Sequence, residues 1–296
     1  MQAQERKPAT AVIFDSSIED EIGQVLALTL LLSYDAKREI RMSSLSVSRN
    51  NLKIAAFCDL MSRFFGVSPV IGMASGGPAR SNVPPMIEAV LSKQAEGDKP
   101  TYVRSISRMN DTADPVALIR NALTAQPDQN SVVVLAGPPV NLLGLLALPG
   151  SKQLIQKKVR TLVLAAPFGD AEGMAKLSAE WPGSVILAGE DLGQSVPFPG
   201  ECIAKDFEWA TNHPLVDAYR AARTMPYDAS ATAMAAVLYA VHPDDNFFKL
   251  TGSGAQARQL QFAANPEYVQ RVTQTYREVV SAKPPDPRRG ARGAQK

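Results

Sequence analysis

The sequence predicts an α/β fold, a doubly wound and mostly parallel sheet flanked by helices. Short runs rich in β-branched residues alternate with segments whose apolar residues recur at helical spacing. Two of the runs, VVVLAG and TLVLAA, are almost entirely apolar, which is typical of strands covered on both faces. Ligands bind such sheets at the carboxyl ends of the strands, so function is expected in the loops that follow them.

The predicted elements alternate along most of the chain. β-Branched runs predict strands at residues 11–14, 40–47, 69–72, 131–136, 160–166 and 184–188. Helical spacing, as in Ile22, Val25, Leu26 and Leu32, predicts helices between the strands. These helices span residues 22–33, 52–65, 86–93, 115–125, 140–148 and 171–179. After about residue 191 the strand pattern fades, and predicted helices at 214–223, 230–241 and 266–281 form a helical C-terminal part over the sheet.

Length and composition indicate a single large domain. The chain has 296 residues, 45% of them hydrophobic, and we assign residues 11–282 to the domain. We expect a disordered N-terminus at residues 1–10 and a disordered basic tail at residues 283–296. The tail carries a net charge of +4 and the whole chain +2, so the rest of the chain carries −2 and the folded body is not a basic surface for nucleic acid.

The location of the protein is only partly constrained by the sequence. No apolar run reaches the roughly eighteen residues that cross a bilayer. We therefore expect a soluble protein with no membrane partner, either cytoplasmic or periplasmic after removal of a signal. The two cysteines, Cys58 and Cys202, are too few for a disulfide framework and stand in no metal-binding motif.

The first predicted strand runs into an acidic loop, IFDSSIEDEIGQVLAL, at residues 13–28. Asp20 and Glu21 favour the positive N-terminal end of the next helix and need no further role. Asp15 directly follows the strand, so we expect it at the ligand crevice. After the second strand, capping explains one of Asn50 and Asn51, and the other is a candidate reader of a sugar or amide.

Other polar motifs have local explanations. The Gly-Pro turn in VVVLAGPPVNLLGLL lacks the glycine spacing and lysine of a phosphate-binding loop, and Asn141 is expected to bond nearby backbone. His213 and His242 each precede a proline at a predicted helix end, where a structural role is favoured over a general base. The loop SVPFPGECI is rigid, and either lines a pocket or connects two elements.

Taken together, these stretches resemble the inosine-uridine preferring nucleoside hydrolase family, which cleaves the N-glycosidic bond of nucleosides. The resemblance covers roughly residues 11–250 and follows the chain order. Its segments are IFDSSIEDEIGQVLAL, LSVSRNN, LAGPPVNLLGLL, SVPFPGECI and HPLVDAYRAARTMPYDASATAMAAVLYAV. The resemblance implies a nucleoside hydrolase-like fold, a calcium ion at the floor of the pocket, and assembly into dimers or tetramers.

The family signature, aligned without gaps, implies that several acidic residues are replaced in this chain. Asp15 keeps the first aspartate. Ser17 stands at the second, which in the family is both calcium ligand and general base. Gly23 and Gln24 stand at an aspartate pair that binds calcium and a ribose hydroxyl, and Ala233 stands at a ligand in the late helix.

Two further positions agree with the family pattern. The resemblance places a calcium-binding backbone carbonyl at Ala136, and Asn50 stands where the family has a pocket asparagine. Calcium takes six to eight oxygen ligands, several of them carboxylates. Because the replaced positions offer no carboxylate, we expect no calcium or other cofactor here. The predicted ligand pocket then comprises Asp15, Ser17, Glu21, Gln24, Asn50, Ala136 and Ala233, with Asp15 as the only candidate catalytic residue.

Two functions follow from this pattern. The first is a nucleoside hydrolase-like protein that is inactive as a standard N-ribohydrolase and binds a nucleoside, a sugar or another polyol. The alternative is an active hydrolase of N-glycosidic bonds in which Asp15, Glu19 or Glu21 supplies the base in a rearranged acidic site.

Overall fold

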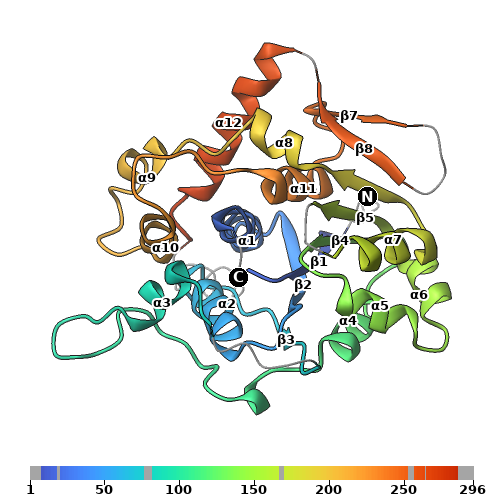
Figure 1. Cartoon of the computed structure of the whole chain (residues 1–296), viewed down its shortest axis with the longest axis horizontal. Coiled ribbons are helices and arrows are strands. Elements are labelled where there is room, and N and C mark those ends of the chain that lie inside the picture. The colour runs from blue at the N-terminus through green and yellow to red at the C-terminus, as the bar shows by residue number, and fades with distance from the viewer. Residues whose placement is uncertain are drawn as a thin grey trace, which may run out of the picture.

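The protein folds around one eight-stranded sheet with helices on both faces (Figure 1). The computed structural model describes residues 8–18, 21–76, 82–166, 170–252, 257–263 and 265–285. The strand order is β3-β2-β1-β4-β5-β6-β8-β7, and every neighbouring pair is parallel except β7 with β8. The strands are β1 (Thr10–Ser16), β2 (Ile40–Val47), β3 (Ile71–Met73), β4 (Ser131–Ala136), β5 (Val159–Ala165), β6 (Val185–Ala188), β7 (Phe248–Thr251) and β8 (Ala257–Phe262). The arrangement confirms the predicted fold class.

The helices divide between the two faces of the sheet (Figure 1). On one face lie α4 (Pro115–Thr124), α5 (Val140–Leu146), α6 (Ser151–Lys158) and α7 (Ala171–Glu180). The other face carries α1 (Ile22–Ala36), α2 (Leu52–Phe64), α3 (Pro85–Ser92), α10 (Pro214–Ala222), α11 (Thr232–Val241) and α12 (Pro266–Val280). Two short helices, α8 (Glu190–Ser195) and α9 (Glu201–Lys205), lie in the connection that follows β6.

Helix α1 is the centre of the larger core. It is buried from Ile22 to Tyr34 and contacts α2, β2 and the later helices α10, α11 and α12. Its sequence, IGQVLALTLLLSYDA, is apolar around nearly the whole helix, as expected for a helix enclosed on all sides. Its position also fixes Gly23 and Gln24, which lie in its first turn.

The strand order places a topological switch point between β1 and β4. The chain runs outward from β1 through β2 to β3 and then returns to β4 on the other side of β1. Open α/β sheets bind ligands in the crevice at such a point. Asp15 pairs in register with Leu135 and Ser16 with Ala136, so the expected site residues end neighbouring strands.

The region after residue 191 adds two strands that the sequence pattern did not reveal. β8 pairs with β6, and β7 closes the sheet edge as an antiparallel partner. Among the β8 residues 258–262, only Leu260 is fully buried, so the strand carries little apolar signal. Helices α6, α8 and α9 were likewise not predicted; α6 is polar, whereas α8 and α9 are only six and five residues long.

The predicted terminal segments lie largely outside the described residues. Residues 1–7 and 286–296 are not described, and β1 already begins at Thr10. Disorder in residues 1–10 and 283–296 therefore stays a prediction. In the described ranges, every helix is too short or too polar to cross a membrane.

Candidate functional site

The carboxyl ends of β1 and β4 and the first turn of α1 form a layer of buried polar groups. We call Asp15, Ser16, Ser17, Gln24 and Ala136 the floor. Asp15, Ser16 and Ala136 have no exposed surface, Ser17 is 1% exposed and Gln24 is 7% exposed. The structure therefore brings four of the seven predicted pocket residues together, and all four are buried.

Asp15 is held by a residue that the sequence did not connect with it. The Asn141 side chain, in the first turn of α5, donates a hydrogen bond of 3.0 Å to Asp15 Oδ1. Asn141 was expected to bond local backbone, an expectation that was wrong because the β1–β4 pairing brings α5 beside Asp15. Oδ2 has no hydrogen-bond partner of normal geometry among the described residues. Burial raises the pKa of Asp15 to about 7, while the Asn141 and Ser46 side chains lower it by less.

The backbone carbonyl of Ala136 is engaged by its neighbours in the floor. It accepts a hydrogen bond of 2.9 Å from Ser16 Oγ and one of 3.3 Å from the Ser17 backbone N–H. The next residue, Gly137, packs so closely that a Cβ there would overlap the Ser17 backbone and the Ser48 hydroxyl. The end of β4 is therefore closed over by the loop after β1.

The side chains of Ser17 and Gln24 are joined by a hydrogen bond. The Ser17 hydroxyl donates a hydrogen bond of 3.2 Å to Gln24 Oε1 across the loop that joins β1 to α1. The residue between strand and helix, Ile18, has φ of 51°, a left-handed conformation that costs a β-branched residue about 1–3 kcal/mol. Its fully buried side chain and its N–H bond of 3.3 Å to Ser16 Oγ hold that conformation. Ser17 and Ile18 are thus tightly constrained beside the floor.

Gly23 and Ala233 stand where the resemblance implies two more acids. A Cβ on Gly23 would overlap the backbone carbonyl oxygen of Ser230, so the segment before α11 leaves no room for a larger residue. Ala233 is 6% exposed in the first turn of α11. The helix start is fixed against α8, because a Cβ on Gly193 would overlap Thr232. At Gly23, close packing of backbone takes the place of a side chain.

Above the floor lies a cavity of about 220 Å³, which we call the mouth cavity. Its walls come from the start of α1, the start of α3, the end of α10 and the segment before α11, and Figure 1 shows α3 and α10 next to each other beside α1. The lining residues are Glu21, Ile22, Gly23, Pro84, Pro85, Met86, Ala222, Arg223, Tyr227, Ala229 and Ser230. Glu21 is thus the one predicted pocket residue in this lining, and Gly23 and Gln24 connect the cavity to the floor.

The loop SVPFPGECI supports the mouth cavity. Phe198 and Ala229 exchange backbone hydrogen bonds of 2.9 and 3.0 Å, and the Gly200 N–H donates a bond of 2.8 Å to Asp228 Oδ1. A Cβ on Gly200 would overlap the Tyr227 carbonyl oxygen. The sequence left open whether this loop lines a pocket or connects elements. In the structure it holds residues 227–230, which form one wall.

Two tyrosines brace the same wall. Tyr219 and Tyr227 stack with ring centroids 4.4 Å apart and an interplanar angle of 13°. The Tyr219 hydroxyl donates a bond of 2.8 Å to the Tyr227 carbonyl, and the Tyr227 hydroxyl returns one of 2.6 Å to the Tyr219 carbonyl. The guanidinium of Arg223 lies 5.9 Å from the centre of the Tyr227 ring. The sequence offered no signal for this arrangement, because its members are brought together by backbone turns.

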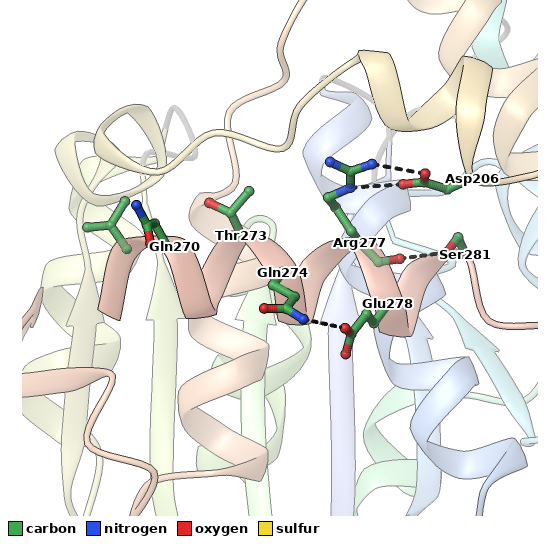
Figure 2. A pocket seen from close by; sticks show the side chains of 8 residues that line it. Asp206, Gln270, Thr273, Gln274, Arg277, Glu278 and Ser281 are labelled. Atoms are coloured by element: carbon green, nitrogen blue, oxygen red, sulfur yellow. Dashed lines mark hydrogen bonds and ion pairs between the residues drawn. The ribbon is translucent and has the colours of Figure 1, made fainter. Parts of the chain in front are cut away.

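A larger hollow of about 700 Å³ lies along α12 (Figure 2). Charged side chains that line this hollow are bonded to other residues of the protein. Arg277 binds both carboxylate oxygens of Asp206 at 3.0 Å, and Gln274 donates a bond of 2.7 Å to Glu278. It lies on the outer helix, away from the carboxyl ends of β1 and β4. The mouth cavity is the better candidate in spite of its smaller volume, because its lining includes Glu21, Ile22 and Gly23, where the chain enters the helix that follows β1.

The remaining predicted residues have separate roles. Asn51 caps α2 by accepting a bond of 3.1 Å from the Lys53 N–H, and Asn50 donates one of 3.4 Å to the Ser75 carbonyl. His213 caps α10 through Nδ1, as its expected structural role requires, and burial lowers its pKa to about 3. Glu19 and Asp20 lie outside the described residues.

The residues at the implied calcium positions do not fit calcium. Ser17 and Gln24 bind each other, Ala233 has no side-chain donor atom, and the Ala136 carbonyl already accepts two hydrogen bonds. No three histidine, cysteine or acidic side chains come together as a metal site within the described part of the chain. Calcium needs several charged oxygen ligands, which this set does not offer. The absence of a cofactor itself stays a prediction.

Comparisons with known proteins connect this architecture to nucleoside hydrolases at the level of the fold. No protein-family model and no curated protein matches the sequence. Solved structures do match. The inosine-uridine preferring nucleoside hydrolase from Bacillus anthracis has a TM-score of 0.63 at 12% identity, covering 91% of this chain and 99% of that one. The plant nucleoside hydrolase PpNRh1 has a TM-score of 0.66 at 13% identity, covering 93% and 100%.

A third similar structure is a protein of another kind. The type III effector protein XopQ, solved in complex with adenosine diphosphate ribose, has a TM-score of 0.71 at 10% identity and covers 93% of this chain and 95% of its own. At such identities the similarity establishes a nucleoside hydrolase-like fold and leaves substrate preference open.

Proposed function

We propose that this protein is a nucleoside hydrolase-like protein that binds a small ribose-containing molecule and does not cleave it by calcium-dependent chemistry. The observation that carries the proposal is the self-contained floor. Ser17 and Gln24, at two implied ligand positions, bind each other, and the Ala136 carbonyl is occupied by Ser16 and Ser17. Loss of a general base alone costs roughly a hundred- to ten-thousandfold in rate.

The ligand class is supported by the retained mouth cavity and by the fold neighbours. The cavity adjoins the switch point, where open α/β sheets bind ligands. The neighbours named above are hydrolases of nucleosides, or an effector complexed with adenosine diphosphate ribose, and all of these compounds contain ribose. We extend that class to this chain and propose a small-molecule partner, with no role for nucleic acid.

The alternative is a hydrolase with a rearranged acidic site. The pKa of Asp15, raised by burial to about 7, is the observation that favours it, because a general base works best near the operating pH. Against it stands the position of the carboxyl group, which has no exposed surface and is bonded to Asn141. Among the described lining residues of the mouth cavity, Glu21 is the only acidic one.

The test combines an activity assay with a ligand screen. We expect no release of base above background from inosine, uridine or a nitrophenyl riboside, with or without added calcium. We also expect a ribose-containing compound, among nucleosides, ribose and adenosine diphosphate ribose, to raise the melting temperature by mass action. Turnover that Asp15→Ala abolishes would establish the alternative, and a screen without any stabilising compound would contradict the binding role.

A restoration experiment tests the assignment of positions. We expect the variant Ser17→Asp with Gln24→Asp and Ala233→Asp to be stabilised by calcium, because it regains three carboxylates near the Ala136 carbonyl. The unmodified protein, measured beside it by thermal unfolding, should show no response to calcium. A triple variant that also ignores calcium would mean that the floor does not correspond to the calcium site of nucleoside hydrolases.

A further inference from the structure

The mouth cavity has a cationic side chain at its lining that lies against an aromatic ring. Among the described lining residues, Arg223 is the only lysine, arginine or histidine. Its guanidinium lies over the Tyr227 ring, which is stacked in turn on the fully buried Tyr219. A cation over an aromatic face is stabilised by about 0.5–1 kcal/mol at an exposed site, enough to favour one orientation. Arg223 therefore has a fixed platform at the rim of the cavity.

No described residue accepts a hydrogen bond from the Arg223 side chain. It forms no ion pair with another described residue, although other arginines, such as Arg63 and Arg277, do. A guanidinium presents five N–H donors in a planar fork that matches the oxygens of a phosphate. Because Arg223 is exposed and already oriented, little conformational entropy is lost when it binds an anion.

The size and composition of the cavity indicate which part of a ligand it holds. Its volume of about 220 Å³ is below the roughly 300–1,000 Å³ of pockets that enclose a whole drug-sized ligand. It therefore takes one end of a larger molecule. Glu21 also belongs to the described lining, and a carboxylate accepts hydrogen bonds from ribose hydroxyls. The two charged groups together suit a ribose that carries a phosphate.

We propose that the mouth cavity binds the phosphate-bearing end of a nucleotide-type ligand through Arg223, so that phosphorylated ribosyl compounds are preferred over bare nucleosides. This proposal rests on the proposed binding of a ribose-containing molecule and names the class of that ligand. It assigns a specificity role to Arg223, which binds the ligand without taking part in chemistry. Arg220, also exposed but on the preceding turn of α10 and outside the lining, has no such role.

Isothermal titration with matched compounds tests the proposal. The full-length protein is titrated with adenosine, adenosine monophosphate and adenosine diphosphate ribose, and with ribose and ribose 5-phosphate. We expect each phosphorylated compound to bind about tenfold or more tightly than its unphosphorylated partner, because charge-assisted bonds contribute about 1.5–3 kcal/mol. Arg223→Gln should remove most of that advantage, and Arg220→Gln, which loses the same charge nearby, should keep it.

The outcomes separate this proposal from the function on which it rests. If adenosine binds as tightly as adenosine monophosphate, the phosphate preference is wrong and the binding function stands. If neither nucleosides nor phosphorylated compounds bind, both are wrong. Equal losses in Arg223→Gln and Arg220→Gln would reveal a general charge effect and overturn the role of Arg223. An Arg223→Lys variant that keeps the charge and recovers only part of the affinity would support the guanidinium fork, and circular dichroism confirms that each variant is folded.

Discussion

The floor and the mouth cavity lie next to each other in the fold and differ in the burial and hydrogen bonding of their polar groups. In the floor, Ser17 binds Gln24, Ser16 binds the Ala136 carbonyl, and no member is more than 7% exposed. In the mouth cavity, Arg223 lies at the surface and is held by tyrosine rings without an ion pair inside the described structure. The floor is part of the packed interior, whereas the mouth cavity has an exposed cationic side chain at its lining.

The comparison teaches that the shape of this fold and the chemistry of its side chains rest on different interactions. The strand order, the switch point and the loop SVPFPGECI depend on packing and backbone hydrogen bonds, which the floor residues do not disturb. Metal binding depends on charged side chains at a few positions, and the proposed function holds that those positions are replaced here. Four experiments, taken from the largest expected effect to the smallest, test whether the two regions differ as described.

The largest effect is expected from Gly23→Asp, which returns an acid to the boundary between the two regions. A Cβ at position 23 overlaps the Ser230 carbonyl oxygen, a backbone atom that cannot move without shifting α11. We expect a loss of about 3–5 kcal/mol in the free energy of unfolding, or failure to fold, measured by urea denaturation. Gly76→Asp is the matched control, because nothing lies within 4 Å of a Cβ there. Equal stability of the two variants would show that the boundary is open.

Asp15→Asn should stabilise the protein in a pH-dependent manner. The folded state raises the pKa of Asp15 from 3.8 to about 7, so it binds this proton more tightly than the unfolded state does. The stability that depends on the protonated group is complete below pH 3.8 and is lost as the pH rises to about 7. Asparagine keeps the acceptor for Asn141 and does not titrate.

The gain from Asp15→Asn should therefore be near zero at pH 4 and reach about 3–4 kcal/mol above pH 7. Denaturant unfolding of both proteins over this pH range measures the difference. Asp98→Asn, at an exposed position, serves as the control and should show no such trend. A gain that stays constant with pH would mean that Asp15 is not enclosed in the floor as the structure has it.

The variants Tyr219→Phe and Tyr227→Phe test the stacked tyrosine pair that supports the wall of the mouth cavity. Both variants keep the stacked rings and remove one hydrogen bond each. Tyr219 is fully buried, so loss of its hydroxyl leaves the Tyr227 carbonyl without a partner and should cost about 1–2 kcal/mol. Water can replace the hydroxyl of the partly exposed Tyr227, so its loss should cost less. Thermal unfolding ranks the two, and the reverse order would contradict a rigid wall built on Tyr219.

The smallest effect concerns the bond between Ser17 and Gln24. A double-mutant cycle with Ser17→Ala, Gln24→Ala and the combined variant isolates their interaction. We expect a coupling energy of about 0.5–1.5 kcal/mol, the usual contribution of a hydrogen bond. The same cycle with Lys53→Ala and Glu88→Ala, an exposed ion pair, should give a smaller value. Additive effects of Ser17 and Gln24 would show that the floor is not self-contained.

Much of the fold could be predicted from local patterns. The apolar runs that became β4 and β5 and the helical spacing of α1 and α2 lie in the larger part of the sheet and its cover, where burial on all sides leaves a strong signal. The pattern failed at β7 and β8, because strands near a sheet edge bury few side chains. Short helices such as α9 were not predicted for a similar reason, since five residues show too little periodicity.

The candidate site was predictable in part. Asp15, Ser17, Gln24 and Ala136 were expected together, and strand ends at the switch point do bring them together. The Asn141 contact and the tyrosine brace were not predictable, because each joins residues whose proximity depends on how turns and helices pack. Asn50 donates a hydrogen bond to the Ser75 carbonyl, and its role as a sugar reader stays a prediction.

The sequence by itself determined the α/β architecture, because apolar runs and helical spacing depend on residue type along the chain, and the replacement of nucleoside hydrolase carboxylates stays a prediction from the resemblance. Only the tertiary structure decided what surrounds those positions. It showed that Gly23 is closed by the Ser230 carbonyl, that Ser17 and Gln24 bond to each other, and that Arg223 stands at a cavity beside a stacked tyrosine pair. These features arise from contacts between segments as distant as α1 and the residues before α11, which local sequence patterns do not encode.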